Sequence, residues 1–278
     1  MAHVELKGSR PSAIAGTWYP GSGPALRRDI ESYLEKVPGG ESRSAPIGLI
    51  APHAGYMYSG QVAAYAYKQI AGHEYDSVAI VSPVHRGVFA RTAAITAVEH
   101  YRTPLGQVPL NGKLVDQFDD AAPVTFLTRD EEHSLEIQLP FLQVVLGQFD
   151  LLPIMLADQS YAFCRQLGEA LANVVRESGR RVLLVASTDL SHFYPYDTAR
   201  SLDQVAIDHI NAYDIAGLGR ALEAGDTHAC GGGPVMAVLI ASQLLGATHA
   251  HILNYANSGD VTGDKSGVVG YAAGVITR

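Results

Sequence analysis

The sequence has very few cysteines, and its first residues do not show the pattern of a secretory signal peptide. Only Cys164 and Cys230 occur among 278 residues, which excludes a framework of disulfides as the main source of stability. Residues 1–7, MAHVELK, lack the apolar core of a signal peptide. We therefore expect a cytoplasmic protein.

Runs of basic residues and long hydrophobic runs are also missing. The formal net charge is −8 and the pI is near 5.7, which argues against nucleic acid or an anionic membrane as the main partner. The longest apolar stretch, residues 234–246, is interrupted by Ser242 and Gln243. This stretch is too short to span a bilayer, so we expect a buried helix there.

What the sequence does contain is a repeated pattern: a short apolar run, a polar break and then a histidine. The runs cover residues 47–51, 78–82 and 182–187, and they lead to His53, His85 and His192. Apolar runs of this length predict strands buried on both faces of a parallel sheet. Ligands of open α/β sheets bind beyond the carboxyl ends of the strands. A lone histidine there is more often a hydrogen-bonded loop or core residue, but three at the same topological position favour one shared site.

The rest of the chain alternates between segments with helical and with strand-like spacing of apolar residues. Helices are predicted over residues 22–37, 60–70, 113–118, 132–146, 161–178, 197–224 in two parts, and 234–246; further strands are predicted over 91–98, 101–108, 151–156, 250–256 and 268–277. Pro140 is expected to kink the helix over 132–146. This alternation predicts an α/β protein, a three-layer α/β/α sandwich around a mostly parallel or mixed sheet. We find no repeat or linker, so we expect one domain over residues 1–278.

A cysteine followed by glycines and a proline, Cys230-Gly231-Gly232-Gly233-Pro234, marks a second chemical feature. The start of a helix lowers the pKa of a thiol, and a thiolate is a good metal ligand. Two imidazoles plus a thiolate form a three-ligand site for zinc, iron or copper with a position left open. The alternative is a small buried thiol packed against glycines, and spacing alone does not decide between the two.

Two further segments place a carboxylate close to a histidine. Asp189 precedes His192 in a loop after a strand, where it would orient the imidazole or cap the turn. His192 itself is a candidate for a fourth ligand or a general base. His133 and Glu136 lie three residues apart at the start of a helix, where they would line the pocket, form an outer shell around it or cap the helix, and spacing alone favours the cap.

Taken in order, the motifs resemble those of the Memo family, known in prokaryotes as AmmeMemoRadiSam system protein B. They are AGTWYP at residues 15–20, APHAGY at 51–56, YRTPLG at 101–106, EHSLE at 132–136, STDLSH at 187–192, CG at 230–231, LNYA at 253–256 and GYAAG at 270–274. The resemblance covers nearly the whole chain. It implies a fold similar to that of the class III extradiol dioxygenases, which hold non-haem Fe(II) with two histidines and a glutamate.

The resemblance also implies roles for particular residues. His53, His85 and Cys230 would be the metal ligands, with iron as first choice and zinc or copper next, and His192 would stand at the acid–base position of the dioxygenases. Cys230 replaces the carboxylate of those enzymes, and a thiolate is softer and more easily oxidised. We further expect the side chains of Tyr56, His133 and Glu136 to line the pocket.

Three functions agree with these features. The first is a metal-dependent oxidoreductase of unknown substrate. The second is a non-catalytic protein that binds a metal, a small molecule or a peptide in the same pocket, in a signalling or scaffold role. The third is a metal-dependent hydrolase with His192 as its base. Fold alone does not decide among them.

Overall fold

Four of the apolar segments form the parallel centre of the main sheet. The computed structural model describes residues 4–39, 42, 44–86 and 93–278. In it, β2 (Gly48–Ala51), β9 (Val182–Ser187), β3 (Ser77–Pro83) and β8 (Asp150–Leu156) are neighbours in this order, and each pair is parallel. All of their residues but Asp150 are buried. The expectation of strands covered on both faces is confirmed.

Antiparallel strands extend this centre on both sides, so the sheet is mixed. On one side, β12 (Val268–Thr277) pairs with β2, β11 (His249–Asn257) and the short β10 (His192–Tyr194). On the other, β4 (Ala93–Thr96) pairs antiparallel with β8 and parallel with β7 (Val124–Leu127). A separate small sheet holds β1 (Ser9–Arg10), β5 (His100–Thr103) and β6 (Gly106–Pro109). Strands β1, β7 and β10 were not predicted.

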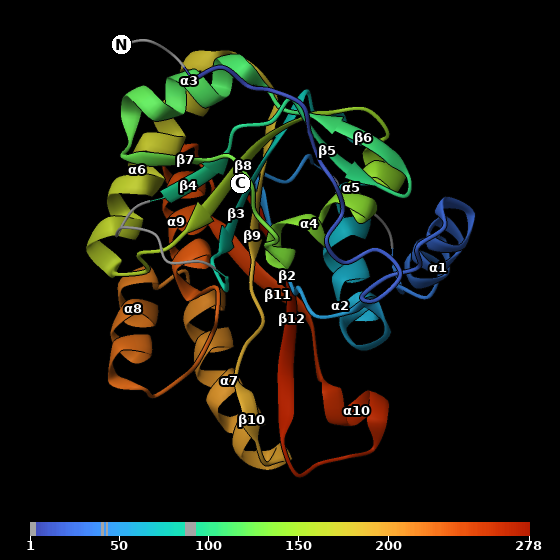
Figure 1. Cartoon of the computed structure of the whole chain (residues 1–278). Helices are drawn as coiled ribbons and strands as arrows, with labels where there is room; N and C mark the ends of the chain where they lie inside the picture. The colour runs from blue at the N-terminus through green and yellow to red at the C-terminus, as the bar shows by residue number, and fades with distance from the viewer. Residues whose placement is uncertain (1–3, 40–41, 43, 87–92) are drawn as a thin grey trace.

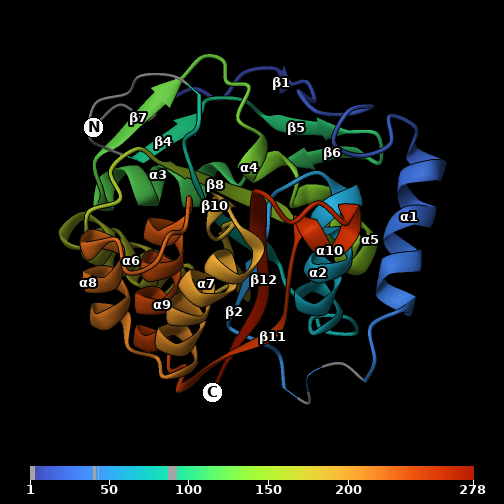
Figure 2. The same cartoon turned by 90° about the horizontal axis from the view of Figure 1, so that it is seen from below.

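Helices cover both faces of the main sheet, and Figure 2 shows the two helical layers on either side of it. On one face, α2 (Tyr56–Lys68) packs on β2, β11 and β12, with α1 (Gly23–Glu35), α5 (Leu139–Leu146) and α10 (Ser258–Thr262) against it. On the other face, α9 (Gly232–Leu244) packs on β2, β3 and β9, and α7 (Tyr196–Asn211) on β11 and β12. Outside them lie α6 (Tyr161–Ser178), α8 (Ile215–Ala224) and α3 (Gly112–Ala121). The predicted α/β/α sandwich is therefore confirmed (Figure 1).

One predicted helix is interrupted in the structure. Residues 132–146 form two helices, α4 (His133–Glu136) and α5. Pro140 lies in the first turn of α5 and does not kink a longer helix, because a proline is well tolerated where the N–H has no helical partner. The break lets the chain turn after α4, which places the α4 side chains beside β3.

Other expectations agree more closely with the structure. The helix predicted over 161–178 coincides with α6, and the apolar stretch after residue 233 lies in α9, which is buried from Gly232 to Ser242. Part of the strand predicted over 91–98 lies outside the described residues, and the rest is β4. Among the described helices, none has the length and apolarity that crossing a membrane requires.

Candidate metal centre

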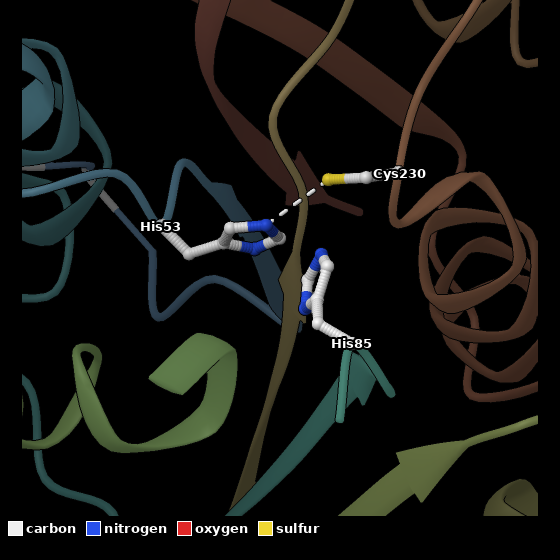
Figure 3. A group of neighbouring side chains, drawn as sticks. All are labelled: His53, His85 and Cys230. Carbon is white, nitrogen blue, oxygen red and sulfur yellow. Dashed lines mark hydrogen bonds between the residues drawn. The ribbon is translucent and has the colours of Figure 1, made fainter. Parts of the chain in front are cut away.

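Three side chains from distant parts of the sequence meet beyond the carboxyl ends of the central strands. His53 follows β2, His85 follows β3, and Cys230 comes just before α9. One ligand atom from each lies within 4.8 Å of the others. His53 Nε2 is 3.0 Å from Cys230 Sγ, and the two imidazole rings have their centroids 5.1 Å apart. Figure 3 shows both rings and the sulfur directed toward a common space.

The turn that presents Cys230 is held against the end of β9. A side chain in place of Gly231 would put its Cβ 2.1 Å from the Ser187 carbonyl oxygen, so the close approach requires a glycine. The Gly231 amide donates to Thr188 Oγ1 over 3.0 Å, and Gln159 Nε2 donates to the Cys230 carbonyl over 2.8 Å. These contacts fix the cysteine beside the strand ends.

The electrostatics of this thiol differ from the expectation for a helix start. Burial, together with the nearby charge of Asp189, raises the pKa of Cys230 well above its usual range. Hydrogen bonds to the sulfur oppose this shift, but they are too weak to offset the loss of hydration. The prediction that the helix start makes a thiolate is therefore wrong for the metal-free site. A bound cation would supply the positive charge that deprotonation needs.

The His85 ring is oriented by a buried carboxylate. His85 Nδ1 lies 2.9 Å from Glu132 Oε1, and the His85 amide donates to Glu132 Oε2 over 2.6 Å. Burial acts to raise the pKa of Glu132, but hydrogen bonds from His85 and from the Ser134 amide hold it well below its usual range. The carboxylate is thus ionised and accepts the Nδ1 proton, which leaves His85 Nε2 free for a metal ion.

A third imidazole, that of His133, completes a cluster of three rings. Its centroid lies 4.6 Å from that of His85, 5.6 Å from that of His53 and 4.3 Å from that of Trp18. Burial lowers the pKa of His133 to about 4 and that of His53 well below its usual value. Neutral imidazoles are the form that binds metals. His85, Glu132 and His133 also form a group with ligand-like spacing, but there His85 Nδ1 is committed to Glu132.

A cavity of about 530 Å³ opens onto the cluster. His133, Asp189 and His192 line it as predicted, together with an aromatic and apolar wall that includes Trp18 and Tyr58. Further lining residues are Thr17, Ala54, Gly55, Met57, Val269 and Tyr271, besides the ligand candidates His53 and His85. The cavity thus offers room for a ligand beside the proposed metal position.

The other two predicted lining residues point elsewhere, and for them the expectation is wrong. The Tyr56 hydroxyl donates to the Ile137 carbonyl over 2.8 Å. The Glu136 carboxylate accepts hydrogen bonds from Arg10 Nη1 over 2.5 Å and from the Tyr19 hydroxyl over 2.6 Å. Neither is among the described residues that line the cavity. The side chains of Tyr56 and Glu136 both stabilise the packing of the protein behind the cavity.

Asp189 and His192 both reach the cavity but do not act on each other as predicted. The His192 ring is held through Nδ1, 2.8 Å from the Leu190 carbonyl, so this nitrogen carries the proton. Asp189 Oδ1 accepts instead from the His53 amide over 2.7 Å. The expectation that Asp189 orients His192 is therefore wrong. Burial raises the pKa of Asp189 to about 7 and lowers that of His192.

Sequence reasoning missed the groups that hold the first histidine. His53 Nδ1 lies 2.9 Å from Ser187 Oγ, and Gln138 Nε2 donates to the same oxygen over 2.8 Å. A glutamine between two helical segments gives no signal of such a role. Ser187 begins the motif at residues 187–192, but the direction of its side chain depends on the register of β9, which the sequence alone does not specify.

Comparisons with known proteins show which family the chain resembles. A family model described as "Memo-like protein" matches residues 10–275. A MEMO1 family protein of Methanopyrus kandleri is 38% identical over 97% of this chain and 99% of its own length. MEMO1 family proteins of Methanothermobacter thermautotrophicus and Methanosarcina mazei are also 38% identical, over 95% and 96% of this chain and 98% of each relative. Among solved structures, an uncharacterized Escherichia coli protein matches with a TM-score of 0.49 at 16% identity, covering 84% of this chain and all of that one.

Proposed function

Because the chain belongs to the Memo family, we propose that it binds one metal ion through His53, His85 and Cys230, iron first and zinc or copper next. The single observation that carries this proposal is the convergence of the three ligand atoms within 4.8 Å. Two imidazoles and a cysteine form a mixed nitrogen and sulfur set, which suits iron, copper and zinc better than magnesium or calcium.

The fit of the residues to a metal rests on the hydrogen bonds around them. Glu132 takes the proton of His85 Nδ1, and His53 Nε2 faces the Cys230 sulfur. The Asp189 amide donates to that sulfur over 3.3 Å, a contact that favours a thiolate once a cation is present. Three protein ligands leave positions open for a substrate.

The reaction class that we propose is oxidation or reduction of a small molecule in the cavity. A bound iron or copper ion would supply the redox centre. His192 lines the cavity, and with its Nδ1 committed to the Leu190 carbonyl it would move a proton to or from the substrate through Nε2. The apolar wall beside Trp18 would exclude water from the reacting atoms.

The apolar and aromatic wall also favours a second candidate, the binding of a small molecule or peptide without catalysis. Both the oxidoreductase and the binding protein would hold the metal ion, but only the oxidoreductase would convert its ligand into a product. A hydrolase that uses metal-bound water is a third candidate, and it differs from the first in consuming no oxygen.

The test begins with protein purified without air or chelator. Metal content measured by mass spectrometry should be near one ion per chain, and it should fall by an order of magnitude or more in His53→Ala. His251→Ala, which removes an exposed histidine of β11, is the matched control. Oxygen uptake with catechols as probes then separates turnover from binding. Full metal occupancy in both His53→Ala and Cys230→Ala would overturn the proposal.

A further inference from the structure

A buried chain of hydrogen bonds ends behind the His53 ring. The Tyr67 hydroxyl donates to Gln138 Oε1 over 2.6 Å. Gln138 Nε2 donates to the Pro52 carbonyl over 3.1 Å and to Ser187 Oγ over 2.8 Å. Because a carbonyl only accepts, the contact with Pro52 fixes which end of the Gln138 amide carries the hydrogens. Gln138 is therefore a donor to Ser187.

Ser187 has a single hydrogen, and its surroundings decide where that hydrogen goes. Ser187 Oγ lies 2.7 Å from the Ser134 carbonyl, to which it donates. The same oxygen already accepts from Gln138. Its remaining contact, 2.9 Å to His53 Nδ1, must then be one in which the imidazole donates. His53 thus carries its proton on Nδ1 and a lone pair on Nε2, the atom that faces Cys230 Sγ.

The opposite tautomer conflicts with these surroundings. It would draw the Ser187 hydrogen toward His53 and take away the donor that the Ser134 carbonyl has in Ser187. A buried carbonyl that loses its donor is costly. It would also place an N–H where the proposed ion needs a lone pair. Ser187 and Ser134 are both fully buried, so water cannot readily replace the missing donor.

We infer that Ser187 is a positioning residue, whose hydroxyl holds the His53 ring in the tautomer that can bind a metal ion. The consequence for metal affinity rests on the proposed function, whereas the tautomer belongs to the metal-free protein. The two histidines are thus set by different means: a carboxylate, that of Glu132, orients His85, and a neutral hydroxyl orients His53.

The tautomer can be measured directly. In metal-free protein with ¹⁵N-labelled histidine, long-range proton–nitrogen NMR correlations report which ring nitrogen carries the proton, and the His53→Ala spectrum identifies the signal. We expect Nδ1–H in the parent protein and a shift toward Nε2–H in Ser187→Ala. A parent protein with Nε2–H at His53 overturns the inference, whether or not the variant folds.

Metal affinity tests the consequence, with Co²⁺ as the probe. Ser187→Ala should weaken Co²⁺ binding about 10- to 100-fold, as loss of an outer-shell partner commonly does. Tyr67→Phe is the matched control. It removes the buried hydrogen bond from the Tyr67 hydroxyl to Gln138 but leaves every hydrogen-bond partner of Ser187 in place. Its Co²⁺ affinity should match that of the parent. Equal losses in the two variants would indicate general destabilisation and overturn the inference.

The two proposals fail in different ways. If the parent protein does not bind Co²⁺ through Cys230, the proposed metal centre is wrong, and the NMR measurement still decides the tautomer. If the parent binds Co²⁺ and Ser187→Ala binds it equally well, the metal centre stands and the role of Ser187 is wrong.

Discussion

The amide of Asp189 donates a hydrogen bond to Cys230 Sγ over 3.3 Å, and the amide of Cys230 donates one to the Asp189 carbonyl over 3.2 Å. This reciprocal pair joins the loop after β9 to the turn before α9, segments that lie 41 residues apart in the chain. The position of the sulfur is therefore set by backbone groups and does not depend on an ion. Substitutions of the cysteine side chain should leave the fold in place.

Replacing the sulfur tests its part in the centre. In Cys230→Ser we expect a folded protein that has lost the near-ultraviolet thiolate-to-metal absorption band of the Co²⁺ form and at least an order of magnitude in Co²⁺ affinity. Cys164→Ala is the matched control, since Cys164 is buried in α6 and belongs to neither group with ligand-like spacing among the described residues, so its loss should leave the band intact. A band that persists in Cys230→Ser would show that another residue supplies the charge transfer.

His192 should matter for reactivity more than for folding. Its ring is half-buried, and the Leu190 carbonyl holds it through one nitrogen. We expect His192→Ala to keep its melting temperature within a few degrees and its metal content unchanged. Any catalysed oxygen uptake should fall by about a hundredfold or more, the usual effect of losing a general acid or base. A large drop in melting temperature, measured by calorimetry, would instead assign His192 to the fold.

The Asp189 carboxyl should make stability depend on pH in the metal-free protein. Burial raises its pKa from 3.8 to about 7, so between these values the unfolded chain releases a proton that the folded chain keeps. The contribution of this group to the free energy of unfolding should therefore be largest below about pH 4 and fall as the pH rises to 7, by up to about 1.4 kcal/mol per pH unit.

Asp189→Asn removes that ionisation while an amide oxygen can still accept from the His53 amide. Relative to the parent, the variant should gain stability as the pH rises from about 4 to 7 and show a constant difference above that range. Urea unfolding curves at several pH values measure the effect. Parallel pH profiles for the two proteins would mean that Asp189 is ionised in the fold.

The buried guanidinium of Arg10 should be essential to stability. It donates to Asp130 over 2.8 Å, to Glu136 over 2.5 Å and to the Glu132 carbonyl over 2.7 Å. Arg10→Met would leave buried carboxylates without their cation, so we expect the free energy of unfolding to fall by about 3–5 kcal/mol. Arg27→Met, which breaks a half-exposed pair with Glu31, should cost less than about 1 kcal/mol. Equal costs in urea titrations would contradict this reasoning.

The positions of the histidines were predictable because strand ends are local properties of the sequence. Each apolar run specifies a buried strand, and His53, His85 and His192 follow at the edge where ligands bind. Side-chain directions were not predictable in this way. Glu136 turns from the cavity because it meets Arg10, 126 residues earlier in the chain. Asp189 turns toward the His53 amide, 136 residues earlier.

The same distinction applies to the fold. The apolar period of α6 is strong, and its bounds were predicted to the residue. Strands β1, β7 and β10 are short and have exposed or half-buried positions, so they lack the continuous apolar run that identifies the central strands. The break between α4 and α5 was missed because leucines at helical spacing run through it, and Pro140 fits both a kink and a first turn.

The wide separation of the ligands in the chain has a consequence for the order of folding. His53 and Cys230 are 177 residues apart, so no short segment of unfolded chain can gather the set. An ion bound as proposed could not nucleate folding as zinc nucleates a zinc finger; it would enter only after β2, β3 and the start of α9 have assembled. It would then stabilise an already folded protein, by about 2.7 kcal/mol when its concentration is a hundred times Kd. Chelation should therefore yield a folded apoprotein, ready to be reloaded.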